Sequence, residues 1–284
     1  MTRLQSDDIA GIAPRLKAYD EELLAKTGCN LRQIACHAVA LEEEAARQIS
    51  PRIRVGVVPI RWGQGVIEGF CEATAAILKH LGLNSFVVGQ SDIAGLAEAY
   101  EMKVDAVFLS DDNDFVALNA ETLQHVHNAD ATGKGFAAGL DLMAKGLADQ
   151  KVLVLGCGAV GRSVTSTLLS YGAKVCVYDI NPSNSREFIS SVAGPDPDRL
   201  TIAPDFHESL AGHSVIVDAT NAAEILQAQD ISPQTFIAAP GMPLGLSRDA
   251  LNKVSERLLH DPLQIGVATM AMAVVRQIAQ IDRK

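Results

Sequence analysis

A glycine-rich turn near the middle of the chain constrains the fold more than any other segment. Residues 151–161 read KVLVLGCGAVG, an apolar run of strand length followed by closely spaced glycines. A helix-compatible stretch comes next, and strand, tight turn and helix in this order begin a dinucleotide-binding βαβ unit. The three glycines then serve the turn, the approach of a pyrophosphate and the packing of helix on strand. We therefore expect contacts to a dinucleotide from Gly156, Gly158, Ala159, Val160 and Gly161.

An acidic residue downstream indicates which dinucleotide binds. The next predicted strand, residues 174–178, ends at Asp179, close to the expected spacing of roughly 20 residues from the glycine motif. A carboxylate here accepts a hydrogen bond from the free ribose hydroxyl of NAD and repels the 2′-phosphate of NADP. Ile180 follows and brings no positive charge to offset that repulsion. The sequence thus predicts NAD as the cofactor, with Asp179 among its contacts.

The rest of the sequence predicts an α/β protein with two domains. Residues 6–49 have the spacing of two amphipathic helices, and residues 52–109 alternate strand-like and helical runs in the order of a parallel βαβαβ unit. After the glycine motif this alternation continues as a Rossmann-type domain. A last helical run is rich in small residues, and we expect it to return to the first domain. The predicted divisions are an N-terminal substrate and catalytic domain at 1–148, an NAD-binding domain at 149–262 and the returning helix at 263–284.

Charge and cysteine usage exclude several classes of partner. The formal net charge is −10 over 284 residues, which disfavours nucleic acid and anionic membranes as partners. No apolar run resembles a leader or a membrane span, so we expect a cytoplasmic location. The five cysteines show no CxxC or Cys/His spacing, and we expect no metal. A small-molecule substrate remains as the expected partner, and a homodimer is compatible with the sequence.

An acidic cluster follows the third predicted strand. Residues 110–114 read SDDND. Carboxylates at the end of a strand can bind an ammonium group, although aspartates that only form turns are common at such positions. Our hypothesis is that Asp112 or Asp111 orients the substrate or accepts its proton.

Several loops taken together resemble one family of enzymes. The segments are VPIRWGQGVIEGF (58–70), FLSDDNDFVALN (108–119), VLVLGCGAVG (152–161), DAT (218–220), APGMP (239–243) and DPLQIGVATM (261–270). In this order they are similar to the PylD family of pyrrolysine-biosynthesis dehydrogenases. Many dehydrogenases share the glycine motif and APGMP, whereas the DD-x-x-F-x-x-x-N stretch and the C-terminal run are specific. The resemblance covers nearly the whole chain.

The resemblance implies a reaction and a set of contacts. The reaction is the NAD-dependent oxidation of the terminal amine of (3R)-3-methyl-D-ornithyl-N6-L-lysine, in which the ornithyl group is carried on the ε-nitrogen of lysine. Ammonia leaves, and closure of a pyrroline ring gives L-pyrrolysine. Implied substrate contacts are Leu4, Gly63, Gln64, Gly65, Asp112 and Asn119. Implied positions near the nicotinamide are Ala219, Thr220, Pro240, Gly241 and Gly266. The chain departs from the family at Arg61-Trp62, where a Thr-Ser pair is usual, and this puts the way the substrate is held in doubt.

Two alternatives of other classes remain. One is a two-domain NAD-dependent dehydrogenase of the shikimate or methylene-tetrahydrofolate type, although the first half shows no obvious Lys/Asp catalytic pair. The other is a non-catalytic NAD sensor. A sensor of this kind needs an effector surface such as a basic DNA-reading helix, and the N-terminal helices are too acidic for that.

Overall fold

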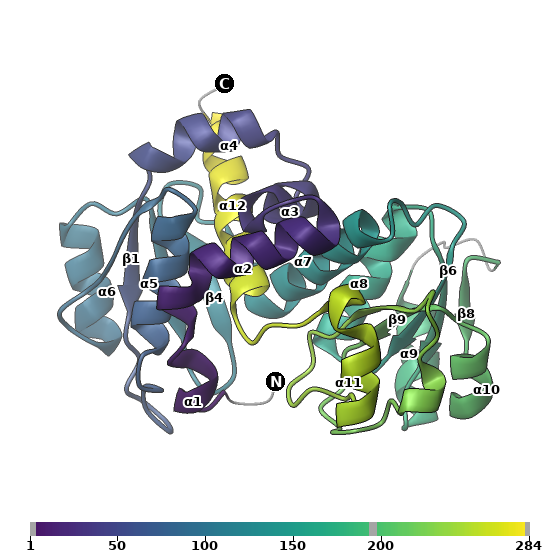
Figure 1. Ribbon diagram of the computed structural model, residues 1–284. Helices are drawn as coiled ribbons and strands as arrows, with labels where there is room; N and C mark the ends of the chain where they lie inside the picture. Colours follow the sequence, from purple (N-terminus) through teal and green to yellow (C-terminus); the bar gives the residue numbers. More distant parts are fainter. Residues whose placement is uncertain (1–3, 193–197, 282–284) are drawn as a thin grey trace. The chain divides into compact units, whose positions relative to one another are not determined.

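The computed structural model describes residues 4–192 and 198–281 and divides into two compact units (Figure 1). Unit 1 takes in the described residues of 1–25, 29–135 and 262–284, and unit 2 those of 26–28 and 136–261. The division after Gly135 falls within the helix α7 (Asn128–Met143), earlier in the chain than the predicted division after residue 148. The C-terminal helix belongs to unit 1.

Unit 1 is built on a five-stranded sheet with the order β2-β1-β3-β4-β5. The strands β1 (Arg54–Val58), β2 (Asn84–Val87) and β3 (Ala106–Ser110) run parallel, as the apolar runs predict. Two further strands, β4 (Phe115–Asn119) and β5 (His125–His127), pair antiparallel beyond β3, and β4 was not predicted. The acidic loop at 111–114 is the tight turn that joins β3 to β4, closed by a 2.9 Å hydrogen bond from the Asp111 amide to the Asp114 carbonyl.

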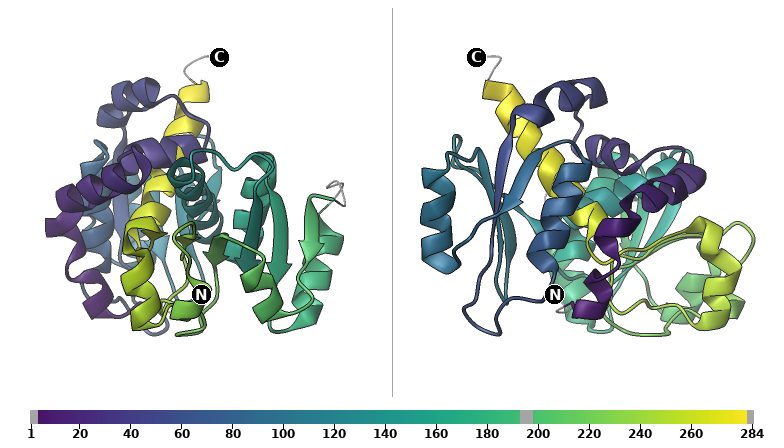
Figure 2. Two further views of the ribbon diagram at one scale, coloured as in Figure 1. Left: turned by 45° about the vertical axis from the view of Figure 1, so that its right-hand side comes forward. Right: turned by 60° about the vertical axis from the view of Figure 1, so that its left-hand side comes forward.

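Helices cover both faces of this sheet. Figures 1 and 2 show α6 (Asp92–Glu101) on one face and α5 (Phe70–His80) with α12 (Gln264–Ile281) on the other. The N-terminal region forms four helices where two were predicted. Gly28, with a φ of 74°, separates the two predicted helices, and each of these is divided again, at residues 10–11 and near Ala40, which has a left-handed φ of 49°. These helices are α1 (Ser6–Ile9), α2 (Ile12–Thr27), α3 (Leu31–Ala38) and α4 (Glu43–Ile49), followed by a 3₁₀ turn at Ser50–Arg52.

The helix α12 lies in the core of unit 1. Ile265, Val267 and Met270 are fully buried, as are most of their neighbours on the helix. A Cβ added to Gly135 on α7 would lie 2.5 Å from Ile265 Cγ2 and would also meet Thr269 Oγ1. Glycine at position 135 therefore lets the two helices cross closely.

Gly135→Ala is expected to lower the free energy of unfolding by about 1–3 kcal/mol, because the added methyl group overpacks this crossing. Gly11→Ala is the matched control, since its Cβ would meet only the flexible Arg15 side chain at 3.9 Å. Chemical denaturation of both variants checks this, and equal stability of the two would contradict it.

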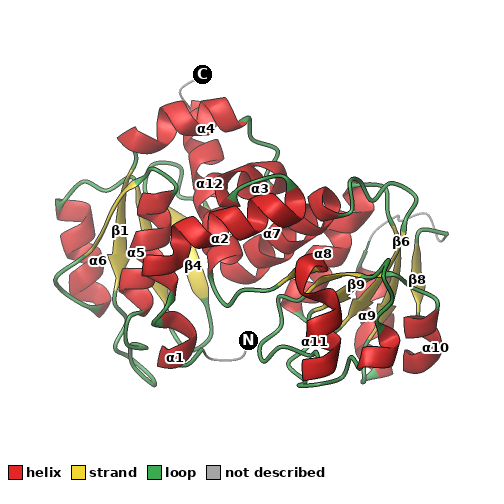
Figure 3. Cartoon of the chain, in the orientation of Figure 1, coloured by secondary structure: helices red, strands yellow, loops and turns green. Residues whose placement is uncertain are grey.

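Unit 2 has a six-stranded sheet with the order β11-β10-β9-β6-β7-β8. Figure 3 draws strands in yellow and helices in red, and labels β6, β8 and β9 of this sheet. The described strand pairs of the sheet are all parallel. The chain starts at the centre with β6, builds outward through β7 and β8, and then returns to add β9 to β11 on the other side of β6. This is the doubly wound dinucleotide-binding order, with the reversal between β6 and β9. The strands are β6 (Lys151–Leu155), β7 (Lys174–Tyr178), β8 (Leu200–Ile202), β9 (Val215–Asp218), β10 (Phe236–Ala238) and β11 (Leu258–Leu259).

The apolar side chains of β6 alternate between the two faces of this sheet, and both faces are buried. Leu153 and Leu155 belong to a buried cluster with Ala250 and Val254 of α11 (Arg248–Val254). Val152 and Val154, equally buried, alternate to the opposite face. The other helical segments are α8 (Ala159–Ser170), α9 (Pro182–Ser191), α10 (Phe206–Ala211) and the 3₁₀ turns Ala228–Asp230 and Ser255–Arg257. The fold class predicted from the sequence is confirmed. Within the described residues, no helix combines the length and apolarity needed to cross a membrane.

Candidate active site

The glycine loop lies at the carboxyl end of β6, beside the point where the strand order of unit 2 reverses. Gly156 has a φ of +93°, and a Cβ on it would lie 2.8 Å from the carbonyl oxygen of Ala219 in the loop after β9. A Cβ on Gly161 would collide with the carbonyl oxygen of Gly156. Both positions therefore need glycine for packing within the protein.

Gly158 differs from the other two glycines of the motif. It is exposed and precedes α8 as its N-cap, and an added Cβ would meet nothing within 4 Å. The protein's own packing does not require glycine here. The space suits an approaching phosphate, because the amides of Ala159 and Val160 open the first turn of α8 and the helix dipole favours negative charge.

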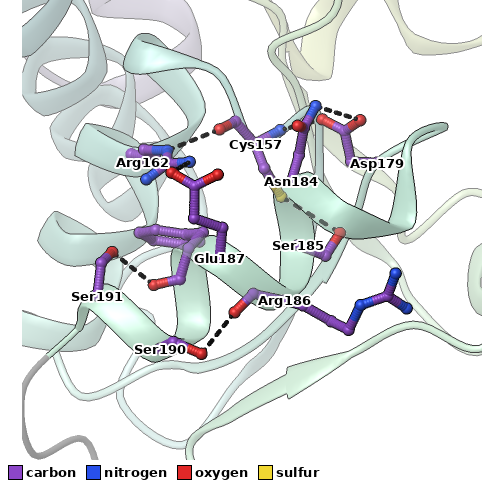
Figure 4. Close-up of polar contacts among 10 residues, drawn as sticks. Cys157, Arg162, Asp179, Asn184, Ser185, Arg186, Glu187, Ser190 and Ser191 are labelled. Atoms are coloured by element: carbon purple, nitrogen blue, oxygen red, sulfur yellow. Dashed lines mark hydrogen bonds and ion pairs between the residues drawn. The ribbon is translucent and has the colours of Figure 1, made fainter.

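Asp179 ties the end of β7 to the glycine loop. Its Oδ2 accepts a 2.8 Å hydrogen bond from the Cys157 amide, and its Oδ1 accepts from Asn184 Nδ2 at 3.0 Å (Figure 4). The same Oδ1 also accepts from the Asn181 amide at 2.9 Å. A carboxylate has about four acceptor positions, so Oδ2 retains capacity for a ribose hydroxyl. Arg162 Nε holds the same loop through a 2.9 Å hydrogen bond to the Cys157 carbonyl. The residues present therefore fit the adenosine end of NAD.

Asp179→Asn is expected to weaken NADH binding by at least tenfold and to reduce the preference over NADPH. The variant removes the negative charge that favours NAD over NADP. If the asparagine NH₂ group takes the place of Oδ2, it faces the Cys157 amide, and two donors then meet without an acceptor. Fluorescence titration with NADH and NADPH measures both effects. Asn184→Ala keeps the carboxylate and serves as the control. Unchanged affinities for both nucleotides in Asp179→Asn would contradict a role in ribose binding.

Four further predicted cofactor contacts lie at the same edge of unit 2. Ala219 and Thr220 follow β9, and Pro240 and Gly241 follow the adjacent β10. The two loops touch, since the Gly241 amide donates to the Asp218 carbonyl at 3.2 Å and a Cβ on Gly241 would collide with the Thr220 carbonyl. The structure thus brings Ala219, Thr220, Pro240 and Gly241 together beside the glycine loop.

Gly266 lies elsewhere, in unit 1. It is buried on α12, where a Cβ would lie 2.6 Å from Thr132 Oγ1 and 2.9 Å from Asn128 Nδ2. Helix packing within unit 1 accounts for the glycine. The predicted contact between Gly266 and NAD therefore stays a prediction, which the neighbours of Gly266 in unit 1 do not support.

Four candidate substrate residues of unit 1 lie at the switch point of its sheet, namely Asp112, Gly63, Gln64 and Gly65. In the order β2-β1-β3 the chain reverses direction between β1 and β3, and ligands of such sheets bind beside the loops at that point. Asp112, from the loop after β3, accepts a 2.8 Å hydrogen bond from the Gln64 amide in the loop after β1. Gly63 has a φ of +77°, and a Cβ on it would collide with Asp112 Oδ2. Gly65 completes the same loop with a φ of +78°.

Asp111 and Asp112 have different surroundings. Asp111 Oδ1 accepts hydrogen bonds from the amides of Asp114 at 2.9 Å and Asn113 at 2.8 Å within its own turn. These two amides hold the pKa of Asp111 below its ordinary value. Asp111 thus shapes the β3–β4 turn, whereas Asp112 reaches across to the loop after β1. We retain Asp112 as the candidate and assign Asp111 a structural role.

Asn119 is separated from Asp112 by the unpredicted hairpin. The pairing sets Asn119 opposite Ala106, at the far end of β3 from the acidic loop, roughly 13 Å along the strand. Its side chain is buried, accepts hydrogen bonds from two amides of the following turn and donates to Gln277. These contacts hold Asn119 at the opposite end of β3 from Asp112 and give no support to its predicted contact with the substrate, which stays a prediction. Leu4 is half-buried just ahead of α1, and its contact with the substrate stays a prediction.

Asp92 is a further residue of this loop cluster that the sequence pattern did not indicate. Its Oδ1 accepts hydrogen bonds from the amides of Arg61 at 2.8 Å and Trp62 at 3.3 Å. The Arg61 amide is the main cause of the lowered pKa of this carboxyl. The loop after β1 is thus held by a carboxylate on each side, Asp92 and Asp112. In the sequence, Ser91-Asp92 is only a helix-start signal, with Ser91 at the N-cap and Asp92 opening α6. The amides that Asp92 holds lie 30 residues or more away in the chain, so no local pattern indicates them.

No grouping of three or more His, Cys, Asp or Glu side chains suited to a metal ion occurs in residues 4–192 and 198–281.

Two protein families match successive parts of this chain. Residues 8–126 match the family described as "Pyrrolysine biosynthesis protein PylD, N-terminal domain". Residues 115–200 match the family described as "D-isomer specific 2-hydroxyacid dehydrogenase, NAD binding domain". The pyrrolysine synthase of Methanosarcina acetivorans is 31% identical over 276 residues, covering 97% of this chain and 100% of that protein.

Solved structures share the fold at low sequence identity. The shikimate dehydrogenase of Aquifex aeolicus is 17% identical with a TM-score of 0.53, over 79% of this chain and 96% of that one. The quinate dehydrogenase of Corynebacterium glutamicum, solved in complex with NAD, is 15% identical with a TM-score of 0.53, over 81% and 98% of the two chains. At these identities the likeness shows a common α/β architecture.

Proposed function

The chain belongs to the PylD family of pyrrolysine-biosynthesis proteins, and from this membership we propose that it oxidises the terminal amine of 3-methyl-D-ornithyl-Nε-L-lysine to form L-pyrrolysine. At the coarser level it is an NAD-dependent dehydrogenase of pyrrolysine biosynthesis. Unit 2 supplies the NAD-binding loops, and the candidate substrate contact Asp112 lies in unit 1.

The proposed reaction balances as one substrate and one NAD⁺ giving the pyrroline product, ammonia, NADH and one proton. Bound NAD⁺ supplies a hydride acceptor. The carbon that bears the neutral terminal amine gives up a hydride and becomes an iminium carbon. The α-amine of the ornithyl group attacks this carbon, and ammonia leaves as the ring C=N bond forms.

The substrate amine must lose a proton before its carbon can give up a hydride. A lysine-like ammonium has a reference pKa near 10.4, so its deprotonation at pH 7 costs about 4–5 kcal/mol. A carboxylate beside the ammonium does not remove this cost, because opposite charge stabilises the protonated form. Asp112 is therefore suited to binding and orienting the ammonium group, and a different group must take the proton.

One observation carries the proposed substrate site. Asp112 and the Gly63–Gly65 loop meet at the switch point of the unit 1 sheet, where Asp112 Oδ2 accepts from the Gln64 amide at 2.8 Å. A carboxylate held by backbone at a position where α/β sheets bind ligands fits a substrate that carries ammonium groups. Arg61 and Trp62, which replace two small hydroxyl residues of the family, are both exposed on this loop.

NADH formation with a panel of substrates tests the proposal. The lysine–methylornithine isopeptide is expected to support turnover, whereas free lysine, ornithine and shikimate are expected to give none above background. Turnover with shikimate in place of the isopeptide would favour a shikimate-type dehydrogenase. NADH binding without turnover of any compound would favour a sensor.

A further inference from the structure

A histidine lies at the same edge of unit 2 as the loops assigned to the nicotinamide. His260 directly follows β11, and β11 pairs with β10 so that the Ala239 amide donates to the Leu259 carbonyl at 2.8 Å. His260 Nδ1 lies 2.7 Å from the carbonyl oxygen of Ala239, the residue ahead of Pro240. Because a carbonyl only accepts, Nδ1 carries the hydrogen in this contact. In the neutral ring Nε2 is then the basic nitrogen, and the side chain is only half-buried.

A fully buried carboxyl group ends a strand of the same sheet edge: Val217 pairs with Ala238 and Ala238 with Leu259, so Asp218 and His260 follow matched positions on either side of Ala239. Asp218, the last residue of β9, has no exposed surface, and its Oδ1 accepts from the Thr220 hydroxyl at 2.7 Å and the Thr220 amide at 3.1 Å. Its Oδ2 is pressed against the backbone of Gly245, where an added Cβ would collide with it. Burial raises the pKa of Asp218, and nearby His260 acts in the opposite direction.

The reaction requires a proton acceptor at this edge. The carbon that gives up the hydride must approach the nicotinamide to about 3–3.5 Å, so its amine lies at the nicotinamide end as well. An efficient base titrates near the working pH, and imidazole is the side chain of that kind. Ala219, Thr220, Pro240 and Gly241 define this end in our assignment, and His260 is joined to them through Ala239.

We propose that His260 is the catalytic base that takes the proton from the substrate ammonium, and that Asp218 is a positioning residue that stabilises the resulting imidazolium. This assignment rests on the proposed amine oxidation. The N–H bond of the ammonium breaks, its electron pair stays on the amine nitrogen, and the proton moves to Nε2 of His260. Uptake of the proton favours the ionised form of Asp218, whose carboxylate in turn stabilises the positive ring.

Other charged groups border this edge. Asp261 follows His260 directly and is buried. Lys26 Nζ donates to the Leu258 carbonyl at 2.8 Å, two residues ahead of His260. Neither side chain changes in the variants below, so their contribution stays constant.

His260→Asn separates proton transfer from anchoring. The asparagine amide can donate to the Ala239 carbonyl in place of Nδ1, but it offers no basic nitrogen in place of Nε2. General-base catalysis contributes about 10²–10⁴-fold, and we expect kcat/KM with the isopeptide to fall by at least 100-fold near neutral pH. NADH affinity should stay within about twofold. The deficit should shrink as the pH rises towards 10, because free amine then binds without needing a base.

A loss of equal size at every pH, or a wild-type rate and pH profile, would overturn the assignment of the base. If His260→Asn does not fold, His260→Gln carries the same rate test. If the wild-type protein forms no NADH from the isopeptide, the proposed function fails, and the pairing of the two residues is still tested by the next measurement.

The pairing has a readout without cofactor or substrate. The imidazole of His260 can be titrated by NMR in the NAD-free protein, with wild type and Asp218→Asn compared. Replacing the carboxylate by a neutral amide destabilises the imidazolium, so we expect the titration midpoint to move to lower pH, together with the acid limb of the kcat/KM profile. An unmoved midpoint would overturn the role of Asp218.

Discussion

Replacing Asp112 by asparagine is expected to lower kcat/KM for the isopeptide by roughly 100-fold. A hydrogen bond to a charged group contributes about 1.5–3 kcal/mol, and an ammonium group left unpaired in a site costs more. Asparagine still offers an oxygen to the Gln64 amide, which donates to Asp112 Oδ2 at 2.8 Å. The loop after β1 should therefore keep its conformation, and the loss should fall on substrate binding and turnover. Steady-state kinetics and NADH titration measure both.

Asp111→Asn is the matched control for this variant. Asp111 Oδ1 accepts the amides of Asn113 and Asp114, and an asparagine oxygen can do the same. We expect kcat/KM within a few-fold of wild type. Equal losses in the two variants would show that the acidic loop acts only as a turn, and a wild-type rate for Asp112→Asn would remove Asp112 from the site.

Alanine at two glycines of the same motif should affect different properties: NADH affinity at Gly158 and stability at Gly161. Gly158→Ala adds a methyl group where no protein atom lies within 4 Å, so the apo protein should keep its melting temperature. NADH affinity should fall by at least about tenfold, because the methyl group takes the space that the pyrophosphate needs. Gly161→Ala sets a Cβ against the Gly156 carbonyl and should destabilise the protein by about 1–3 kcal/mol even without NAD.

Melting curves and NADH titrations of the two variants check this pair. Wild-type NADH affinity in a stable Gly158→Ala protein would contradict the assignment of the phosphate to this loop. A wild-type melting temperature for Gly161→Ala would mean that the loop relaxes without cost.

The sequence predicted those parts of the fold that short-range patterns specify. The apolar runs of β1, β3, β6 and β9 were recognised because buried parallel strands are continuously hydrophobic. The NAD loop was recognised because its glycines and Asp179 stand at a fixed spacing. The strand β11, with only two residues, and α9, in a polar segment, carried too little pattern to be identified.

Long-range pairing decided what the sequence could not show. Whether the acidic loop was a tight turn or an open loop depended on the pairing of β4 with β3, and that pairing moved Asn119 away from Asp112. Asp92 lies 30 residues or more from the amides that it holds, and His260 lies 21 residues from Ala239. Each of these contacts depends on which strands are neighbours, and residue spacing alone does not contain that information.

The fate of the terminal nitrogen tests the central proposal most directly. An isopeptide labelled with ¹⁵N at the terminal amine of the ornithyl group can be turned over with NAD⁺, and ammonia, NADH and the amino-acid product can then be analysed by mass spectrometry. Oxidation at that amine predicts labelled ammonia in a one-to-one ratio with NADH and an unlabelled pyrroline ring. Retention of the label in the product, or unlabelled ammonia, would contradict it.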